Sequence, residues 1–436
     1  MRAAQTIILG GGMTGLAAGM ASGVPVYEAE ATPGGICASY YIRPGDTRRL
    51  AAPPADENAY HFEIGGGHWI FGGDPVIVRL ITDFAPCKSS KRISSVYFHE
   101  SGLSVPYPLQ NNLRFLDPAI AERALAEMAA PHDGGTTLKE WLHASFGPTL
   151  SELFFDPFHD LYTAGLYDRI APQDAYKSPV DIRLARQGAL GTAPPVGYNV
   201  TYLYPEAGLD ALARQLAKRA DVRYRKRAVA IDVEAREVRF EDGSVVPYRR
   251  LISTLPLNVM LALTGLSVEA PPDPFTSVLV LNLGALRGPK CPPDHWLYNC
   301  RTRAGFHRVG FYSNVDSSFL PRRGRHDRVG IYVERAFVGG TRPTPAEEAA
   351  YARAVVAELQ DWGFIGSPDV VDPTWIDVAY TWARPGSRWR AQALACLEAR
   401  DVYPVGRYGR WIFQGIADSI RDGLFVGAAL KEAGPG

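Results

Sequence analysis

Apolar and polar residues follow two periods along this chain, and each period predicts a type of element. Short apolar runs over Thr6–Leu9 and Val24–Tyr27 are typical of buried strands, and the Ala-rich segment between them is typical of a helix. Alternation of apolar and polar residues predicts a hairpin over 93–108 and further antiparallel strands over 228–248. The apolar run Leu251–Leu255 predicts a buried strand that returns to the first sheet.

The middle of the chain follows the helical period instead. Apolar residues recur at helical spacing in three successive segments, so we expect residues 115–195 to be mainly helical. The three segments are Pro118–Ala129, Leu138–Phe146 and Thr149–Phe155. Three or four strands are expected within 276–337, and a helix over Pro345–Trp362 follows them.

A glycine-rich segment, G-G-G-M-T-G, joins the first strand to the first helix. Gly10 permits a tight turn, Gly12 lets the backbone approach a pyrophosphate, and Gly15 lets the helix pack closely on the strand. The helix N-terminus at Met13 and Thr14 directs unpaired N–H groups at the phosphates. This order of strand, glycine motif and helix indicates a Rossmann-type dinucleotide site.

The residues after the second strand identify the dinucleotide more closely. Glu28 ends that strand, where an acidic side chain accepts the ribose hydroxyl groups. A second glycine pair, Gly34 and Gly35, follows almost at once. NAD dehydrogenases usually lack such a pair, whereas flavoproteins of the glutathione-reductase and amine-oxidase types have it. We therefore expect the cofactor to be FAD.

Two further segments are candidates for contact with the flavin. Gly66 and Gly67 remove side chains where backbone must lie against a flat object, which we take to be the isoalloxazine, and His68 follows them directly. His68 is either a structural residue or one that acts beside the flavin. Near the C-terminus, the start of a predicted helix at Asp418 and Ser419 is placed to cap the pyrimidine end of the flavin.

These patterns predict an α/β protein with three domains, because 436 residues are too many for one compact core. We expect a discontinuous Rossmann-like FAD-binding domain of the glutathione-reductase type, an inserted helical domain and an antiparallel β-sheet domain for the substrate. Their predicted bounds are 1–85, 200–260 and 390–436 for the first domain, 115–199 for the helical domain, and 86–114 with 261–389 for the sheet domain.

Composition narrows the class of protein. Basic and acidic residues balance at 46 each, which argues against a nucleic-acid binder or a membrane-surface binder. The five cysteines are scattered and contain no C-x-x-C pair, so we expect neither a disulfide framework nor a metal site. The first strand begins within ten residues of the start and no long apolar run occurs, so we expect a soluble cytoplasmic protein. The oligomeric state stays open.

The segment from Phe158 to Tyr167 is dense in aromatic side chains with polar tips, and it includes His159. It is either a core helix whose histidine is satisfied internally or one wall of a substrate cleft.

Taken in order, these motifs resemble the UDP-galactopyranose mutases, especially the eukaryotic type, within the amine-oxidase and protoporphyrinogen-oxidase superfamily. The run V-P-Y-P-L-Q-N-N over Val105–Asn112 carries the most specific part of the resemblance. Other matching stretches are spread over nearly the whole length: Thr32–Gly35, Gly66–Phe71, Arg92–Ser94, Trp296–Tyr298, Arg308, Tyr312–Asn314 and Gly406–Gly409.

The resemblance implies a FAD domain, a helical domain and a six-stranded sheet domain, with a nucleotide sugar bound against the flavin. It also implies a reaction in which reduced FAD interconverts pyranose and furanose sugars through an adduct at flavin N5, without net redox change. Arg308 and Tyr298 would then bind the diphosphate, and Arg407 and His68 would lie beside the flavin. The second phosphate-binding arginine would be Arg183 or Arg186, and His159 stands where the family has an asparagine.

Three further positions depart from the family. Val315 and Phe413 replace tyrosines, and Ala417 replaces an asparagine. Losing hydrogen bonds to a charged leaving group indicates either a site rebuilt for another nucleotide sugar or a substrate without a diphosphate. The alternative function is a FAD-dependent oxidoreductase, an oxidase or desaturase, in a biosynthetic pathway. The sequence lacks a second dinucleotide motif, which fits NAD(P)H as a reductant that binds transiently in the substrate cleft; which nucleotide reduces the flavin stays open.

Overall fold

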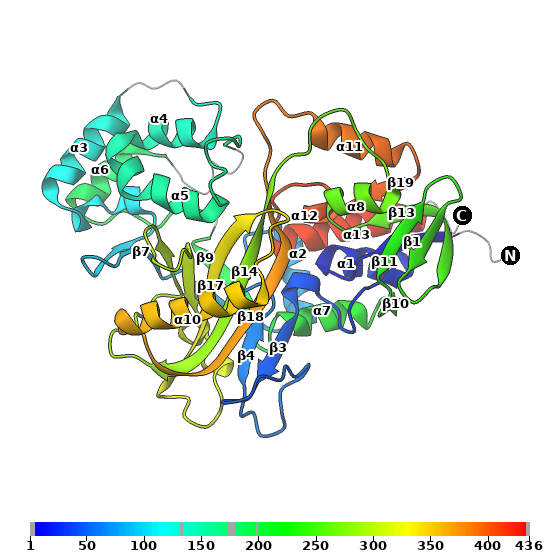
Figure 1. The fold of residues 1–436 in the computed structure, drawn as a ribbon, viewed down its shortest axis with the longest axis horizontal. Coiled ribbons are helices and arrows are strands. Elements are labelled where there is room, and N and C mark those ends of the chain that lie inside the picture. The colour runs from blue at the N-terminus through cyan, green and yellow to red at the C-terminus, as the bar shows by residue number, and fades with distance from the viewer. Residues whose placement is uncertain (1–4, 131–133, 173–179, 198, 433–436) are drawn as a thin grey trace.

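The computed structural model describes residues 5–130, 134–172, 180–197 and 199–432. Figure 1 shows three bodies: a helical body at the upper left, a large sheet in the centre, and a layered α/β body at the right. The expected helical domain, 115–199, includes residues 131–133, 173–179 and 198, which lie outside the described residues.

The α/β body is built on a sheet of seven strands in the order β10-β2-β1-β13-β12-β11, with β19 beside β13. Strands β10, β2, β1, β13 and β19 run parallel, and β13 bends on into an antiparallel hairpin layer with β12 and β11. The strands are β1 Gln5–Leu9, β2 Val26–Tyr27, β10 Val222–Arg223, β11 Ala228–Asp232, β12 Glu237–Phe240, β13 Val245–Ser253 and β19 Val402–Pro404. The predicted return of the apolar run near Leu251 to the first sheet is thus confirmed.

Helices cover this sheet. The first helix, α1 (Met13–Ser22), packs against the last, α13 (Ile416–Glu432), and Gly423 and Gly427 make that close approach possible. A Cβ on Gly427 would come within 2.6 Å of the carbonyl oxygen of Ala18. The other helices of this body are α2 Pro75–Phe84, α7 Leu209–Ala217, α8 Leu257–Thr264, α11 Trp389–Glu398 and α12 Gly406–Gly409.

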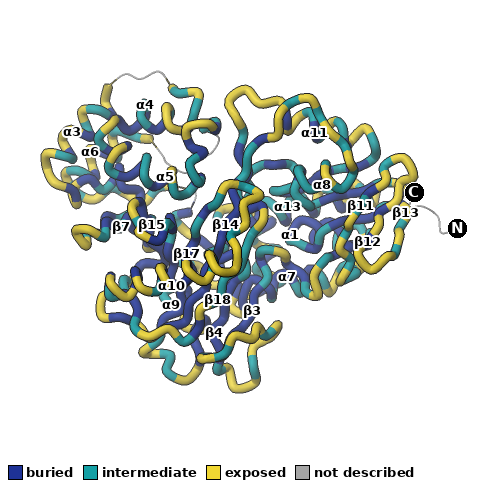
Figure 2. The backbone as a smooth tube through the Cα atoms, viewed as in Figure 1, coloured by how far each residue is buried: buried dark blue, intermediate teal, exposed yellow. Residues whose placement is uncertain are grey.

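The central sheet has the order β18-β14-β17-β16-β15-β7-β8. Helix α10 (Pro345–Asp361) covers one face of it, and Figure 2 shows that β14 and β17 are buried over much of their length. The strands are β7 Ser94–Phe98, β8 Leu103–Pro106, β14 Phe275–Arg287, β15 Trp296–Asn299, β16 Arg308–Phe311, β17 Arg328–Val338 and β18 Ile365–Thr381; the short helix α9 (Tyr312–Val315) follows β16.

Two expectations for this sheet were wrong. It has seven strands rather than six, because β18 adds a long strand at one edge. Pro368 and Pro373 interrupt the sequence pattern of β18, and an edge strand tolerates proline because one of its sides needs no ladder hydrogen bonds. The sheet is also mixed rather than antiparallel, since β7 runs parallel to β15.

The helical body contains α3 (Pro118–Ala129), α4 (Leu138–Leu150), α5 (Asp156–Thr163) and α6 (Ile182–Leu190). Asp117 caps α3, and Thr137 with Glu140 forms a capping box on α4, so local sequence fixes where both helices begin. The predicted break after Phe146 falls at Gly147, whose φ of 75° kinks α4 rather than ending it.

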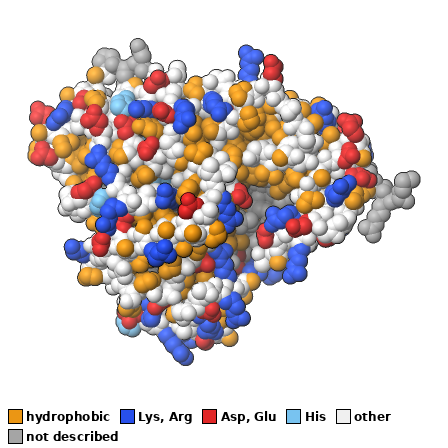
Figure 3. All heavy atoms as spheres, in the orientation of Figure 1, with side chains coloured by type: hydrophobic (Ala, Val, Ile, Leu, Met, Phe, Trp, Pro, Cys, Tyr) orange, Lys and Arg blue, Asp and Glu red, His pale blue; other side chains and the backbone are white. Residues whose placement is uncertain are grey.

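Two smaller sheets join these bodies: β3 (Ser39–Ile42) with β4 (Tyr60–Glu63), and β5 (Ile70–Phe71) with β9 (Thr201–Pro205) and β6 (Cys87–Lys91). Over the described ranges, no helix combines the length and apolar character that a membrane crossing requires. Figure 3 shows basic and acidic side chains interspersed over the face in view.

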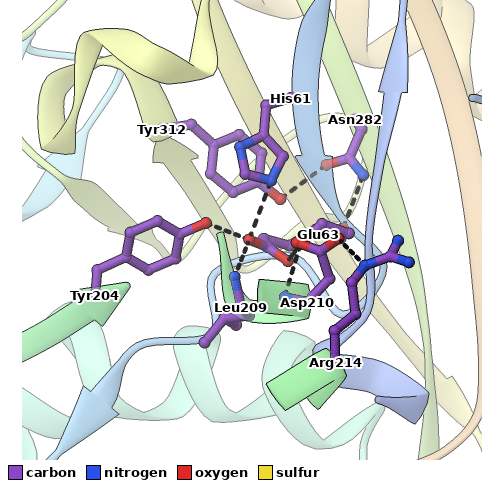
Figure 4. Close-up of polar contacts among 9 residues, drawn as sticks. His61, Glu63, Tyr204, Leu209, Asp210, Arg214, Asn282 and Tyr312 are labelled. Atoms are coloured by element: carbon purple, nitrogen blue, oxygen red, sulfur yellow. Dashed lines mark hydrogen bonds and ion pairs between the residues drawn. The ribbon is translucent and has the colours of Figure 1, made fainter. Parts of the chain in front are cut away.

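A buried polar cluster ends β4 and fixes the start of the glycine loop that follows it (Figure 4). The Glu63 carboxyl group accepts hydrogen bonds from Tyr204, from Ser39 at 2.7 Å and from the Leu209 N–H at 3.4 Å. Its side chain is fully buried, and this burial raises its pKa to about 8. The cluster therefore ties β3, β4, β9 and the first turn of α7 together through a group that binds a proton readily.

Candidate active site

The glycine motif adopts the geometry that its sequence predicts. Gly10 has φ of 97°, and a Cβ at Gly15 would overlap the Gly10 carbonyl oxygen, so both positions need glycine. A Cβ at Gly12 would meet nothing within 4 Å, which leaves the backbone accessible from the cleft. Helix α1 has no side-chain cap, so the N–H groups at Met13 and Thr14 lie at an uncapped helix N-terminus.

Glu28 and the second glycine pair hold this loop from the other side. The Glu28 carboxylate accepts the Gly11 N–H at 2.6 Å and the Glu30 N–H at 2.7 Å. Gly34, with φ of 116°, donates its N–H to the Gly11 carbonyl at 2.8 Å, and Gly35 has φ of 57°. A carboxylate oxygen can accept a second hydrogen bond. Glu28 can therefore hold the loop and still accept a hydrogen bond from a ligand in the cleft.

A cleft of about 540 Å³ runs over these residues. Its lining includes Gly10, Gly12, Met13, Thr14, Glu28, Gly34, Gly35, His68, Arg407 and Ser419. Uncapped helix N–H groups at one place and an acidic side chain beyond them suit a diphosphate and a ribose, respectively. The residues present therefore fit a dinucleotide.

A second cavity, of about 450 Å³, continues from this cleft. The two share eight lining residues: Ile36, His68, Ile376, Arg407, Tyr408, Gln414, Gly415 and Ile416. Arg407 donates to the carbonyl oxygens of Gln414 at 3.0 Å and Ala379 at 3.3 Å, and its guanidinium lies 4.6 Å from the centre of the Phe413 ring. A ligand in the second cavity would thus lie next to one end of a dinucleotide in the cleft.

The glycine loop after β4 lines the second cavity through Gly65 and Gly67, and His68 lines both spaces. A Cβ at Gly67 would overlap the Tyr332 hydroxyl, and one at Gly66 would lie 3.0 Å from a Glu334 carboxylate oxygen. One side of Gly67 therefore lies against the Tyr332 ring, while Gly67 also lines the second cavity; its contact with a flavin stays a prediction. Burial, together with the nearby Arg407 guanidinium, lowers the pKa of His68 to about 4, so this histidine is neutral at physiological pH.

One row of residues crosses the central sheet along the wall of the second cavity. Tyr298 on β15 pairs with Arg308 on β16, Arg308 with Glu334 on β17, and Glu334 with Val280 on β14. Directly opposed residues project from the same face of a sheet, and all four line the cavity. The sheet therefore presents a phenol, a guanidinium and a carboxylate side by side on a rigid surface.

Arg308 and Glu334 form a buried ion pair. The Arg308 Nε donates to Glu334 at 3.0 Å, and its Nη2 lies 2.6 Å from both carboxylate oxygens. Burial would raise the pKa of Glu334, but the Arg308 guanidinium outweighs it and lowers that pKa to about 2. Next to them His307, whose pKa burial lowers, lies 3.5 Å from Glu334. The pair is charged but has no net charge.

Aromatic side chains form the opposite wall. Phe158 and Tyr162 of α5 stack at 5.6 Å, and the Phe158 ring meets Tyr298 edge-on at the same distance. His159 also lines the cavity, and its Nδ1 lies 2.7 Å from the Phe155 carbonyl oxygen, which fixes the ring. The segment flagged from the sequence is thus both a core helix and a cavity wall.

The sequence profile described as "Flavin containing amine oxidoreductase" matches residues 13–436. The chain belongs to this family. The family implies FAD, so the predicted cofactor is confirmed at that level. Among curated proteins, none matches the chain at a significant level.

Solved structures show the same fold. Reduced UDP-galactopyranose mutase superimposes with a TM-score of 0.82 over 99% of this chain and 96% of that chain, at 20% identity. A protein from Exiguobacterium sp. 255-15, provisionally described as a protoporphyrinogen oxidase, gives 0.68 over 99% and 100%, at 15% identity. Putrescine oxidase bound to putrescine gives 0.56 over 98% of both chains, at 16% identity. The predicted α/β fold is thereby confirmed.

Most predicted site residues come together in the structure. Tyr298, Arg308, His159, Gly67, His68, Arg407 and Asp418 line the second cavity. Arg183 does not: its side chain is 87% exposed on α6, paired at 3.0 Å with Asp181, which caps that helix. Arg186 is exposed as well, and neither arginine lines the cleft or the cavity, so a second phosphate-binding arginine stays a prediction.

The three departures from the mutase pattern fall in different places. Phe413 lines the second cavity, where it packs on Arg407. Val315 and Ala417 pack into the hydrophobic core instead, and neither lines the cleft or the cavity. Of these three changes, the one at Phe413 faces the second cavity, as does His159, which also departs from the family pattern.

Sequence reasoning missed Glu334, His307 and Tyr332. A signal existed for the first: Glu334 is a charged residue that directly follows the apolar run Ile331–Val333, within the region 276–337 where strands were expected. Such a residue is almost never fully buried unless it is paired, so the pattern indicates a buried partner without naming it.

Proposed function

We propose that this flavoenzyme is a mutase that interconverts the pyranose and furanose forms of a nucleotide sugar. The observation that carries the proposal is the row of Tyr298 and Arg308 on the cavity wall, continuous with the FAD cleft through His68 and Arg407. A departing diphosphate needs oriented donors close to the cofactor, and these side chains supply them. The TM-score to reduced UDP-galactopyranose mutase supports the proposal.

The chain's own residues have three tasks in such a reaction. Arg308 and Tyr298 donate hydrogen bonds to the diphosphate, both while it is attached to the sugar and after it leaves. Neutral His68 lies where cofactor and sugar would meet and adds no charge there. Phe158 and Tyr162 close the cavity from the helical body and exclude water from an opened sugar. Reduced FAD would supply the nucleophilic ring nitrogen.

A second candidate is a FAD-dependent oxidoreductase acting on a substrate without a diphosphate. One observation favours it: Glu334 cancels the charge of Arg308, in a cavity whose other wall is aromatic. An uncharged or aromatic substrate would enter such a cavity without needing a strong cation.

One anaerobic experiment separates the two. The FAD-loaded protein is reduced with dithionite, or in parallel with NADH or NADPH, and incubated with UDP-hexoses and GDP-hexoses. Under the mutase proposal the sugar ring contracts and the flavin spectrum stays reduced. The proposal fails if no nucleotide sugar binds or changes, and rapid reoxidation of the reduced flavin by air would then favour the oxidoreductase.

A further inference from the structure

Glu334 sits in an unfavourable place for a carboxylate. Its neighbours on β17, Ile331 and Val333, are fully buried, and its own side chain is 2% exposed. A buried charge is costly unless it is paired and hydrogen-bonded. We therefore look for a role of the Glu334 carboxylate that an apolar side chain at the same position could not perform.

Its pairing with Arg308 orients that guanidinium. Glu334 takes the Nε and Nη2 donors of Arg308, and the antiparallel register of β16 and β17 places the two residues directly opposite one another. The Nη1 of Arg308 takes no part in this pairing. Because the Arg308 side chain is 20% exposed and that of Glu334 only 2%, the guanidinium is the more accessible partner.

The pairing also changes the charge of the cavity. Among the described lining residues, Arg407 is the other guanidinium, and it is already bonded to two backbone carbonyl groups. Asp418, on the same lining, is paired at 3.2 Å with Arg421. Two arginines and two carboxylates therefore face the cavity, and their formal charges cancel.

We propose that Glu334 is a positioning residue that sets the affinity of this cavity for anions: it holds Arg308 in one orientation and cancels its charge. This inference rests on the proposed function and deepens it. A diphosphate would be bound through the hydrogen-bond donors of Arg308 and Tyr298 rather than through net positive charge. Its affinity would be lower than that given by an Arg308 without a carboxylate partner.

The test measures UDP binding to the FAD-loaded protein by calorimetry at about 20 mM and about 300 mM NaCl, a range over which exposed charges become screened. In Glu334→Gln the amide preserves the shape and one acceptor but leaves the charge of Arg308 uncancelled. We expect UDP to bind about tenfold more tightly at low salt, and the gain to shrink at high salt. Glu334→Asp, which keeps the charge, should fall between the two proteins.

A matched control is available on the other face of the sheet. Glu358 of α10 is 1% exposed and accepts the N–H groups of Arg303 and Ala304 at 2.9 and 2.8 Å. Glu358→Gln removes a buried carboxylate far from the cavity lining, so it reports the effect of lost stability alone. It should leave UDP affinity and its salt dependence unchanged.

Unchanged or weaker UDP binding by both Glu334 variants, with FAD still bound, would overturn the proposal. Removing the partner of a buried arginine destabilises proteins, so the UDP-induced rise in melting temperature is measured as well; it should be larger in Glu334→Gln than in the wild type. If Glu334→Gln does not fold, Glu334→Asp decides by the same comparison. If Glu334→Gln binds UDP and the wild type does not, the role of Glu334 stands and the mutase proposal falls. If neither the wild type nor Glu334→Gln binds UDP, both proposals fall.

Discussion

The buried Glu63 cluster predicts an unusual dependence of stability on pH. Glu63 is fully buried, and its hydrogen-bond donors are neutral groups. The guanidinium drawn in Figure 4, that of Arg214, pairs with Asp210 at 3.0 Å instead. The nearest base, His61, lies 3.6 Å away, and burial lowers its pKa to about 4, so it is neutral when Glu63 would ionise. The perturbation to make is Glu63→Gln, which imitates the protonated carboxyl group.

The size of the effect follows from the pKa. The carboxyl group has an ordinary pKa of 4.5, and burial raises it to about 8 in the folded protein. Between these values the folded chain keeps a proton that the unfolded chain releases, so this group makes the free energy of unfolding fall as pH rises. The slope is about 1.4 kcal/mol per pH unit, which amounts to about 3 kcal/mol between about pH 5 and about pH 7.

The assay is urea denaturation of the FAD-loaded wild type and Glu63→Gln side by side, from about pH 5 to about pH 8. The variant should equal the wild type at the acid end and exceed it increasingly toward the alkaline end. Glu206→Gln, at an exposed site next to the cluster, is the matched control and should show no such trend. If Glu63→Gln is less stable than the wild type by a constant amount at every pH, the carboxylate is ionised in the folded protein and the reasoning is refuted.

Three further outcomes are expected. Arg308→Ala should weaken UDP binding about tenfold to hundredfold while FAD stays bound, as expected for a hydrogen bond to a charged group worth about 1.5–3 kcal/mol; calorimetry and the flavin spectrum check it, and unchanged affinity would remove the phosphate role. His68→Ala should shift the flavin absorption or its reduction rate without lowering the melting temperature much, and a wild-type spectrum with wild-type activity would leave His68 a structural residue. Gly15→Ala should abolish FAD retention, because its Cβ would overlap the Gly10 carbonyl oxygen; retention of bound flavin after gel filtration would contradict this.

The dinucleotide half of the site could be predicted because its determinants are local. Gly10, Gly12 and Gly15 act within one turn. Positive φ at Gly10 and the close approach of Gly15 to the Gly10 carbonyl oxygen require glycine at these two positions, and Gly12 leaves the backbone accessible. Glu28 and Gly34 follow within the same β-α-β unit. Short-range steric requirements of this kind can be predicted directly from the sequence.

The substrate half depends on register between strands, which the sequence does not reveal. Glu334 contacts Arg308 because β16 and β17 place the two residues opposite each other, and no local sequence pattern predicts that pairing. Arg183 illustrates the complementary case, because its position relative to the cavity also depends on tertiary structure. Its local sequence suits a cation on a helix, but the helix presents it to solvent and its capping residue Asp181 binds it.

The packing of α1 against α13 has a consequence for how the protein is made. The first helix of the chain is covered by the last, and β19, from residues 402–404, completes the sheet that β1 begins. During synthesis, the side of α1 that contacts α13 therefore has no native partner until nearly the whole chain has been made. Since Arg407 and Ser419 line the dinucleotide cleft, a cofactor bound there would also gain its full set of contacts only then. Flavin loading should be among the last events in the biogenesis of this enzyme, and truncations near the C-terminus should yield colourless, chaperone-bound chains.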